Sequence, residues 1–193
     1  MSAQRIAVIP GDGIGVANKD PLLRNRRSVS LDLKKPESIA AVRRIVAGAD
    51  AIIEGFRPGV MERLGLGYEA LREINPRLIY CSISGYGQSG PAAERAAYAM
   101  IVHAESGFDT SLMRYAGDRE RPAAGAIFVA DILGGIFGYS AIQTAMVQRV
   151  RTGEGQRVDV ALRQTLDLGA LPRLVAPQAE KIADLGDRTR DRI

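Results

Sequence analysis

The sequence predicts an α/β fold in which helical crossovers join the strands of a parallel sheet. Short apolar segments alternate along the chain with segments whose apolar residues recur at helical spacing. The strands of this sheet are expected near residues 28–33, 50–56 and 78–83. An order of strand, helix, strand, helix, strand favours parallel pairing, because each helix returns the chain to the edge where the previous strand began.

Local signals mark the first predicted elements. Residues 5–10 form a short apolar segment typical of a strand, and residues 28–33 alternate polar and apolar side chains. Pro36 stands where a helix can begin, because the first turn does not need its missing N–H. Gly48 ends that helix, and residues 51–56 then have the pattern of a buried strand.

The same alternation continues further along the chain. Residues 60–75 have helical spacing that is interrupted by Gly65 and Gly67, and Pro76 stops it. A long apolar helix should end near Val150, and residues 157–161 again resemble a strand. Residues 164–193 are charged and poorly patterned, so they predict a weak helix or a disordered tail.

The composition is that of a globular protein. Hydrophobic residues make up 46% of the chain and charged residues 25%, a balance that supports a core. No apolar run reaches the length of a membrane span and the N-terminus lacks the layout of a signal peptide, so we expect a cytoplasmic protein outside the membrane. The net charge of +4 comes from scattered basic residues, and no tryptophan is present to stack bases, which disfavours nucleic-acid binding.

A carboxylate inside an apolar run is the main candidate for chemistry. Asp131 interrupts the apolar residues 127–133 and stands shortly before Gly134 and Gly135 at the expected start of the long helix. We expect this carboxylate to be largely shielded from water, because desolvation would raise its pKa and make it a better nucleophile. The two glycines would let a substrate approach the backbone. The alternative, which the residue pattern alone favours, is that Asp131 only caps the helix.

The other reactive side chains have simpler interpretations. His103 is the only histidine and Cys81 the only cysteine, so the sequence predicts neither a metal site nor an internal disulfide. We interpret His103 as a residue on a helix face and Cys81 as a small core residue in an apolar strand. Residues 11–15 read GDGIG after a strand, a weak dinucleotide-binding signal because the usual spacing is GxGxxG.

Four blocks of sequence carry a resemblance to a known family. They read NRRSVSLDLK at 25–34, GFRPGVMERLGLGY at 55–68, NPRLIYCSISGYG at 75–87 and RTGEGQRVDV at 151–160. In these blocks and in their order the chain resembles CoA-transferase family III, the group of the formyl-CoA and carnitine CoA-transferases. The resemblance implies a partial Rossmann-like parallel sheet with helical crossovers, without the second domain of the family.

The resemblance divides the chain into three parts. Residues 22–163 resemble part of the family core, and residues 164–193 are the poorly patterned tail. Residues 1–21 form an atypical N-terminal segment, in which the family's opening strand and nucleotide-binding loop are absent. Residues 1–16 are instead similar to the start of isopropylmalate and tartrate dehydrogenases, so the alternative function is that of an NAD-dependent decarboxylating dehydrogenase. A third possibility is a non-catalytic fragment.

The resemblance also implies a site and its substrates. Asp131 matches the catalytic aspartate of the family, which forms an acyl-aspartyl anhydride and then an aspartyl-CoA thioester. Arg26, Phe56, Arg57 and Arg63 match positions near the CoA, where guanidinium groups suit phosphates. The implied substrates are an acyl-CoA thioester and small carboxylic acids, with no metal and no tightly bound cofactor. Family members form interlocked dimers, which implies a homodimer or self-association here.

Several positions depart from the family pattern. Gly55 stands where the family has an asparagine before Phe-Arg-Pro-Gly, and Ala99 stands where an acidic residue is usual. The related racemases have a histidine where this chain has Tyr98, which disfavours racemase chemistry. Together with the missing parts of the family fold, these changes predict that the chain transfers CoA poorly.

Overall fold

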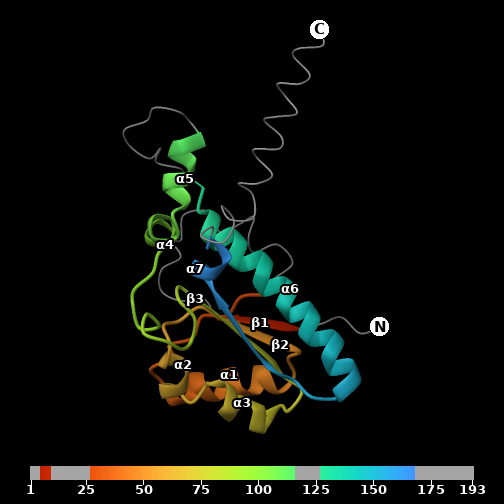
Figure 1. Ribbon diagram of the computed structural model, residues 1–193. Coiled ribbons are helices and arrows are strands. Elements are labelled where there is room, and N and C mark those ends of the chain that lie inside the picture. Colours follow the sequence, from red (N-terminus) through yellow and green to blue (C-terminus); the bar gives the residue numbers. More distant parts are fainter. Residues whose placement is uncertain (1–4, 10–26, 116–126, 168–193) are drawn as a thin grey trace, which may run out of the picture.

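A parallel sheet forms the centre of the computed structural model, which describes residues 5–9, 27–115 and 127–167 (Figure 1). Its strand order follows the chain, and every neighbouring pair is parallel. The strands are β1 (Ile6–Ile9), β2 (Ala51–Glu54), β3 (Ile79–Ser84) and β4 (Arg157–Ala161).

Helices lie on both faces of this sheet (Figure 1). One face is covered by helices of the first two crossovers, and the other by the long helix that leads into β4. The helices are α1 (Pro36–Ala47), α2 (Val60–Arg63), α3 (Tyr68–Ile74), α4 (Ala99–Ser106), α5 (Phe108–Tyr115), α6 (Val129–Thr152) and α7 (Leu162–Thr165).

The sheet separates two hydrophobic clusters. Ile52 and Tyr80 project towards the cluster formed with α1, α2 and α3, whereas Ala51, Ile79 and Cys81 project towards α6. Neighbouring residues of a strand point to opposite faces, so both faces of β2 and β3 are buried. This double burial explains why these strands are nearly continuous apolar runs in the sequence.

The predicted core role of Cys81 is confirmed. Its side chain is completely buried between β3 and α6. Burial raises the pKa of the Cys81 thiol to about 12, so the thiolate needed for reactivity is not formed near neutral pH.

The sheet agrees with the sequence prediction except at one strand. The strands expected near 50–56 and 78–83 are β2 and β3, and the segments at 5–10 and 157–161 contain β1 and β4. The strand expected at 28–33 is wrong, because these residues contain no strand. Their alternation has another cause.

The apolar residues of segment 28–33 pack into the core instead of forming a sheet. Leu31 and Leu33 are partly buried against the α1–α3 cluster. The position beside β2 is occupied by β1, in which Ile6 pairs with Ala51. The predicted helix start at Pro36 is confirmed, because α1 begins there.

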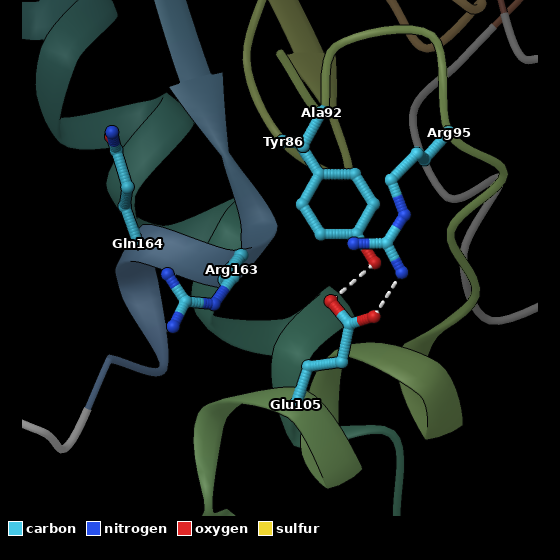
Figure 2. A pocket seen from close by; sticks show the side chains of 6 residues that line it. All are labelled: Tyr86, Ala92, Arg95, Glu105, Arg163 and Gln164. Carbon is cyan, nitrogen blue, oxygen red and sulfur yellow. Dashed lines mark hydrogen bonds and ion pairs between the residues drawn. The ribbon is translucent and has the colours of Figure 1, made fainter. Parts of the chain in front are cut away.

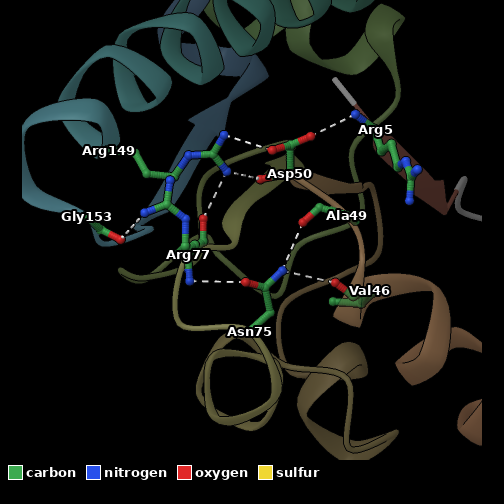
Figure 3. A network of polar contacts seen from close by, with 8 residues as sticks. All are labelled: Arg5, Val46, Ala49, Asp50, Asn75, Arg77, Arg149 and Gly153. Atoms are coloured by element: carbon green, nitrogen blue, oxygen red, sulfur yellow. Dashed lines mark hydrogen bonds and ion pairs between the residues drawn. The ribbon is translucent and has the colours of Figure 1, made fainter. Parts of the chain in front are cut away.

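A polar network joins the amino-terminal ends of β2 and β3 to the end of α6 (Figure 3). Arg149 donates from Nη2 to Oδ1 of Asp50 at 2.9 Å, and from Nη1 to the carbonyl oxygens of Asp50 and Arg77 at 3.1 Å each. The Asp50 carboxylate also accepts the N–H of Arg5 at 2.9 Å, which connects β1 to the same network. The network therefore positions the last turns of α6 against the sheet.

Among residues 5–9, 27–115 and 127–167, none of the helices combines the length and the apolar character that a transmembrane span requires.

Candidate functional site

Asp131 lies in the first turn of α6, as the sequence predicts for its position. The helix begins at Val129, and its N-cap residue is Phe128, which makes no side-chain capping bond. Asp131 is therefore not the N-cap. Its carboxylate makes no hydrogen bond or ion pair within the described part of the chain, so no contact there ties it to a structural role.

The expectation that Asp131 is largely shielded from water is wrong. The residue is exposed, and so is the neighbouring Ile132. The reason is the orientation of the first turn, in which Ala130 faces the interior and is fully buried. Part of the Asp131 side chain still lies against the protein, and this partial desolvation raises the pKa of the carboxyl group.

The two glycines after Asp131 have different surroundings. A Cβ on Gly134 would lie 2.3 Å from Cδ2 of Leu162 and 3.7 Å from Cγ2 of Ile83, so Gly134 allows α6 to pack closely on α7 and β3. A Cβ on Gly135 would meet nothing within 4 Å. Only Gly135 therefore leaves the helix surface open in the way expected for substrate approach.

α6 places Asp131 at the carboxyl edge of the parallel sheet. Near its start, Gly134 approaches Ile83 in the last part of β3. Near its end, Arg149 contacts Asp50 and Arg77, which precede β2 and β3. In open α/β sheets, ligands bind outside the carboxyl ends of the strands. Asp131 therefore lies at the edge where a substrate is expected.

His103 contacts the start of α6, which the sequence does not indicate. It lies on α4, as expected for a helix residue, but it is buried. Its Nε2 accepts the backbone N–H of Ala130 at 3.1 Å. Residues 103 and 130 are far apart in the sequence and no local pattern links them.

The residues expected near CoA fall partly in one turn. Phe56 and Arg57 follow β2, and Arg63 is the last residue of α2. Phe56 is half-buried against the α1–α3 cluster, whereas both arginines are exposed. The turn lies at the same sheet edge as Asp131. No described hydrogen bond or ion pair joins Phe56, Arg57 or Arg63 to Asp131. Arg26 lies outside the described residues.

Glu54 is a buried carboxylate that sequence reasoning missed. It ends β2, and its Oε2 accepts the N–H of Phe56 at 2.8 Å. Burial raises the pKa of Glu54. The signal was present, because Glu54 interrupts the apolar residues 51–56 in the way that Asp131 interrupts 127–133.

Replacing Glu54 by glutamine should make stability less dependent on pH. Because the folded pKa of Glu54 is raised, the folded chain loses stability as pH rises from the ordinary value of 4.5 through the folded value. Glutamine stays neutral and can still accept the N–H of Phe56. At pH values above the folded pKa of Glu54, we expect the Glu54→Gln variant to have a higher free energy of unfolding than the parent. Below pH 4.5 this difference should disappear.

Urea unfolding at a series of pH values measures this difference. Glu73→Gln on α3 is the matched control, because Glu73 is exposed. A parent and a Glu54→Gln variant with the same pH profile would show that burial of Glu54 carries no energetic penalty.

A pocket of about 430 Å³ opens at the carboxyl ends of β3 and β4 (Figure 2). Tyr86 donates from its hydroxyl to Oε2 of Glu105 at 2.7 Å, and Arg95 forms an ion pair with the same carboxylate. The Arg95 guanidinium also lies 5.0 Å above the centre of the Tyr86 ring. The lining residues are Tyr86, Ala92, Arg95, Glu105, Arg163 and Gln164.

The pocket can hold an anionic group better than a cationic one. Its lining has two guanidinium groups and one carboxylate, and that carboxylate is paired. Arg163 also pairs with Asp167 at 3.3 Å. Sequence reasoning missed the pocket, because its residues come from three separate segments. No group of metal-ligating side chains occurs in the described ranges 5–9, 27–115 and 127–167.

The known proteins that this chain resembles in sequence are CoA-transferases. The family model described as CoA-transferase family III matches residues 17–179. Succinate–glutarate CoA-transferase of Agrobacterium fabrum is 45% identical over 153 residues, which are 79% of this chain and 37% of the relative. Acetyl-CoA:oxalate CoA-transferase of Acetobacter aceti is 43% identical over 141 residues, which are 72% of this chain and 35% of the relative. The chain thus spans little more than a third of the length of these two relatives.

Solved structures with a similar fold are known. A CaiB/BaiF family protein from Brucella suis has a TM-score of 0.69 and 40% identity, and the match covers 83% of this chain and 40% of that chain. Rv3272 from Mycobacterium tuberculosis has a TM-score of 0.73 and 30% identity, with coverage of 94% and 50%. The predicted α/β class, with a parallel sheet and helical crossovers, is confirmed.

Proposed function

The chain belongs to CoA-transferase family III, and from this premise we propose that it moves CoA from an acyl-CoA thioester to a carboxylic acid through Asp131. The observation that carries the proposal is the carboxylate of Asp131 in the first turn of α6. It is exposed and has no described structural partner, and partial desolvation by the protein raises its pKa. A carboxylate in this state can reach a substrate and is a stronger nucleophile than an ordinary one.

The proposed reaction exchanges the CoA thiol between two acyl groups. A carboxylate oxygen of Asp131 attacks the thioester carbonyl, the C–S bond breaks, and an acyl-aspartyl anhydride and CoA thiolate form. The thiolate then attacks the carbonyl of Asp131, which releases the first carboxylate and leaves an aspartyl-CoA thioester. The acceptor carboxylate attacks this thioester, and the thiolate finally takes the acceptor's acyl group from the new anhydride. The Asp131 carboxyl is thus acylated, then joined to CoA as a thioester, then acylated again by the acceptor, and finally free.

The residues that bind CoA are part of the same proposal. Arg57, in the turn after β2, and Arg63, at the end of α2, are exposed, and their guanidinium groups can pair with phosphates of CoA. We assign Phe56 to contact with an apolar or ring part of CoA, and Arg26 to a further phosphate contact. No tightly bound cofactor enters this scheme, because every covalent step takes place among Asp131, CoA and the two carboxylic acids.

We assign short carboxylic acids as acceptors, as the names of the relatives suggest. Those relatives act on succinate, glutarate and oxalate. The dehydrogenase alternative rested on residues 1–16 alone, and the family match from residue 17 onward favours CoA transfer instead. We also propose that the protein works in the cytoplasm, since its single cysteine is a buried free thiol.

The test is to trap the aspartyl intermediate. The purified chain is incubated with succinyl-, formyl- or oxalyl-CoA, and mass spectrometry locates adducts that hydroxylamine removes. We expect an adduct at Asp131, and a loss of about a thousandfold or more in thioester exchange on Asp131→Ala, because the nucleophile is removed.

Asp109→Ala is the matched control, since Asp109 is also an acid in the first turn of a helix. Adduct formation elsewhere, or equal exchange by the Asp131→Ala variant, would contradict the proposal. Because the chain spans 37% of the length of the A. fabrum relative, we expect it to exchange CoA more slowly than that full-length protein assayed beside it.

We further propose that the chain associates with a second copy through the outer face of α6. This face has a series of exposed apolar side chains, and such contiguous patches mark interaction surfaces. They include Ile132, Ile136, Phe137, Tyr139 and Val147. Sedimentation velocity should show dimers or larger species that the double change Ile136→Lys and Tyr139→Lys converts to monomers. A compact monomer at high concentration, without binding of an apolar dye, would contradict this proposal.

A further inference from the structure

The first turn of α6 depends on a side chain from another helix. The first N–H groups of a helix have no partner within the helix and need one from elsewhere. Phe128, at the N-cap, provides none through its side chain. For the N–H of Ala130 the partner is Nε2 of His103, which lies on α4 at 3.1 Å.

The His103 imidazole is held in place on several sides. The residue is only 3% exposed, and its ring centre lies 5.0 Å from that of Phe108, tilted by 49°. The next residue towards the N-terminus, Val102, is fully buried in a cluster with Ala130 and Leu166. A buried ring with few alternative rotamers can fix the position of the group to which it is hydrogen-bonded.

The hydrogen bond also determines the state of the ring. A nitrogen that accepts an N–H carries no proton, so the single proton of the neutral imidazole lies on Nδ1. In a protonated ring both nitrogens would be donors, and Nε2 would face the N–H of Ala130 without an acceptor. The geometry therefore requires the neutral Nδ1–H tautomer of His103.

We propose that His103 is a positioning residue for the reaction at Asp131. It accepts the N–H of Ala130, the residue before Asp131, and so holds the first turn of α6 in place. This inference rests on the proposed function of Asp131. The mechanism is indirect, because His103 bonds the backbone of Ala130 and Asp131 is the next residue along the helix. Reactions between bound groups are sensitive to such placement, and a displacement of about 1 Å can cost about a hundredfold in rate.

Three substitutions separate positioning from general stability. His103→Gln keeps an acceptor near the position of Nε2, whereas His103→Leu fills the space without one. Leu71→Ala is the matched control, since it removes fully buried atoms from the cluster on the other face of the sheet, away from the bond to Ala130. Urea unfolding identifies the variants that remain folded.

The catalytic readout is the rate of adduct formation at Asp131 with succinyl-CoA. We expect His103→Leu to lose about a hundredfold in the rate constant at saturation, with little change in the concentration for half-saturation. His103→Gln should stay within about threefold of the parent, and so should Leu71→Ala despite its lower stability. A folded His103→Leu variant that reacts at the rate of the parent would overturn the proposal.

Two spectroscopic readouts do not depend on activity. Nitrogen-15 NMR of the imidazole should show the Nδ1–H tautomer, and amide hydrogen exchange at the N–H of Ala130 should be slow in the parent and in His103→Gln. In His103→Leu this N–H has lost its acceptor, so it should exchange faster. If the parent forms no adduct, the proposed function fails while these readouts still decide the role of His103. An Nε2–H tautomer would overturn the proposed role of His103.

Discussion

Replacing Gly155 by alanine is expected to destabilise the fold by about 3–5 kcal/mol, a large part of the roughly 5–15 kcal/mol that stabilises a typical domain. A Cβ at this position would lie 2.0 Å from the carbonyl oxygen of Leu78, 2.5 Å from its carbonyl carbon and 2.6 Å from that of Arg77. All three are backbone atoms at the start of β3, so no side-chain rotation relieves the overlap. The N–H of Gly155 also donates to the carbonyl of Pro76 at 2.9 Å, which holds the two segments together.

Gly135→Ala is the matched control for Gly155→Ala. Its Cβ would meet nothing within 4 Å, and it lies inside α6, where alanine is favoured over glycine by about 0.5–1 kcal/mol. Circular dichroism during urea unfolding should therefore show opposite changes in the two variants. A Gly155→Ala variant with the stability of the parent would mean that the loop before β4 can move away from β3 at no cost.

Replacing Arg149 by methionine should lower the free energy of unfolding by about 2–4 kcal/mol. Hydrogen bonds to a charged group contribute about 1.5–3 kcal/mol each, and the desolvation of the charges offsets part of this contribution. The side chain of Arg149 is 11% exposed and that of Asp50 is 32% exposed. The change removes three hydrogen bonds to Asp50 and Arg77 (Figure 3). The Nε of Arg149 is buried without a described partner, which reduces the net gain from the pair.

The pH dependence identifies the Asp50 contribution. The N–H of Arg5, together with Arg149, holds the pKa of Asp50 below its ordinary value of 3.8. A lowered pKa contributes stability that is present above the ordinary value and is lost as pH falls through the folded value. The difference between parent and Arg149→Met should therefore shrink in acid. Arg151→Met, at an exposed position two residues later, should stay within about 0.5 kcal/mol of the parent.

Local sequence signals were sufficient for most of the secondary structure. Pro36 begins α1 as expected, because proline is tolerated in the first turn of a helix. β2 and β3 were predicted because strands buried on both faces are apolar throughout. Segment 28–33 was misread because an alternating pattern records only which side chains are buried. Leu31 and Leu33 are partly buried without any strand partner.

The sequence by itself determined that Asp131 lies in the first turn of a long helix, since the apolar run and its interruption are local features. Only the tertiary structure decided that its carboxylate is exposed, because exposure depends on which face of α6 packs on the sheet. The bond between His103 and Ala130, and the pocket that contains Glu105 and Arg163, likewise join segments distant in the chain. Periodicity reports the burial of a residue within its own element, whereas hydrogen bonds between elements arise only when the sheet and its helices are packed.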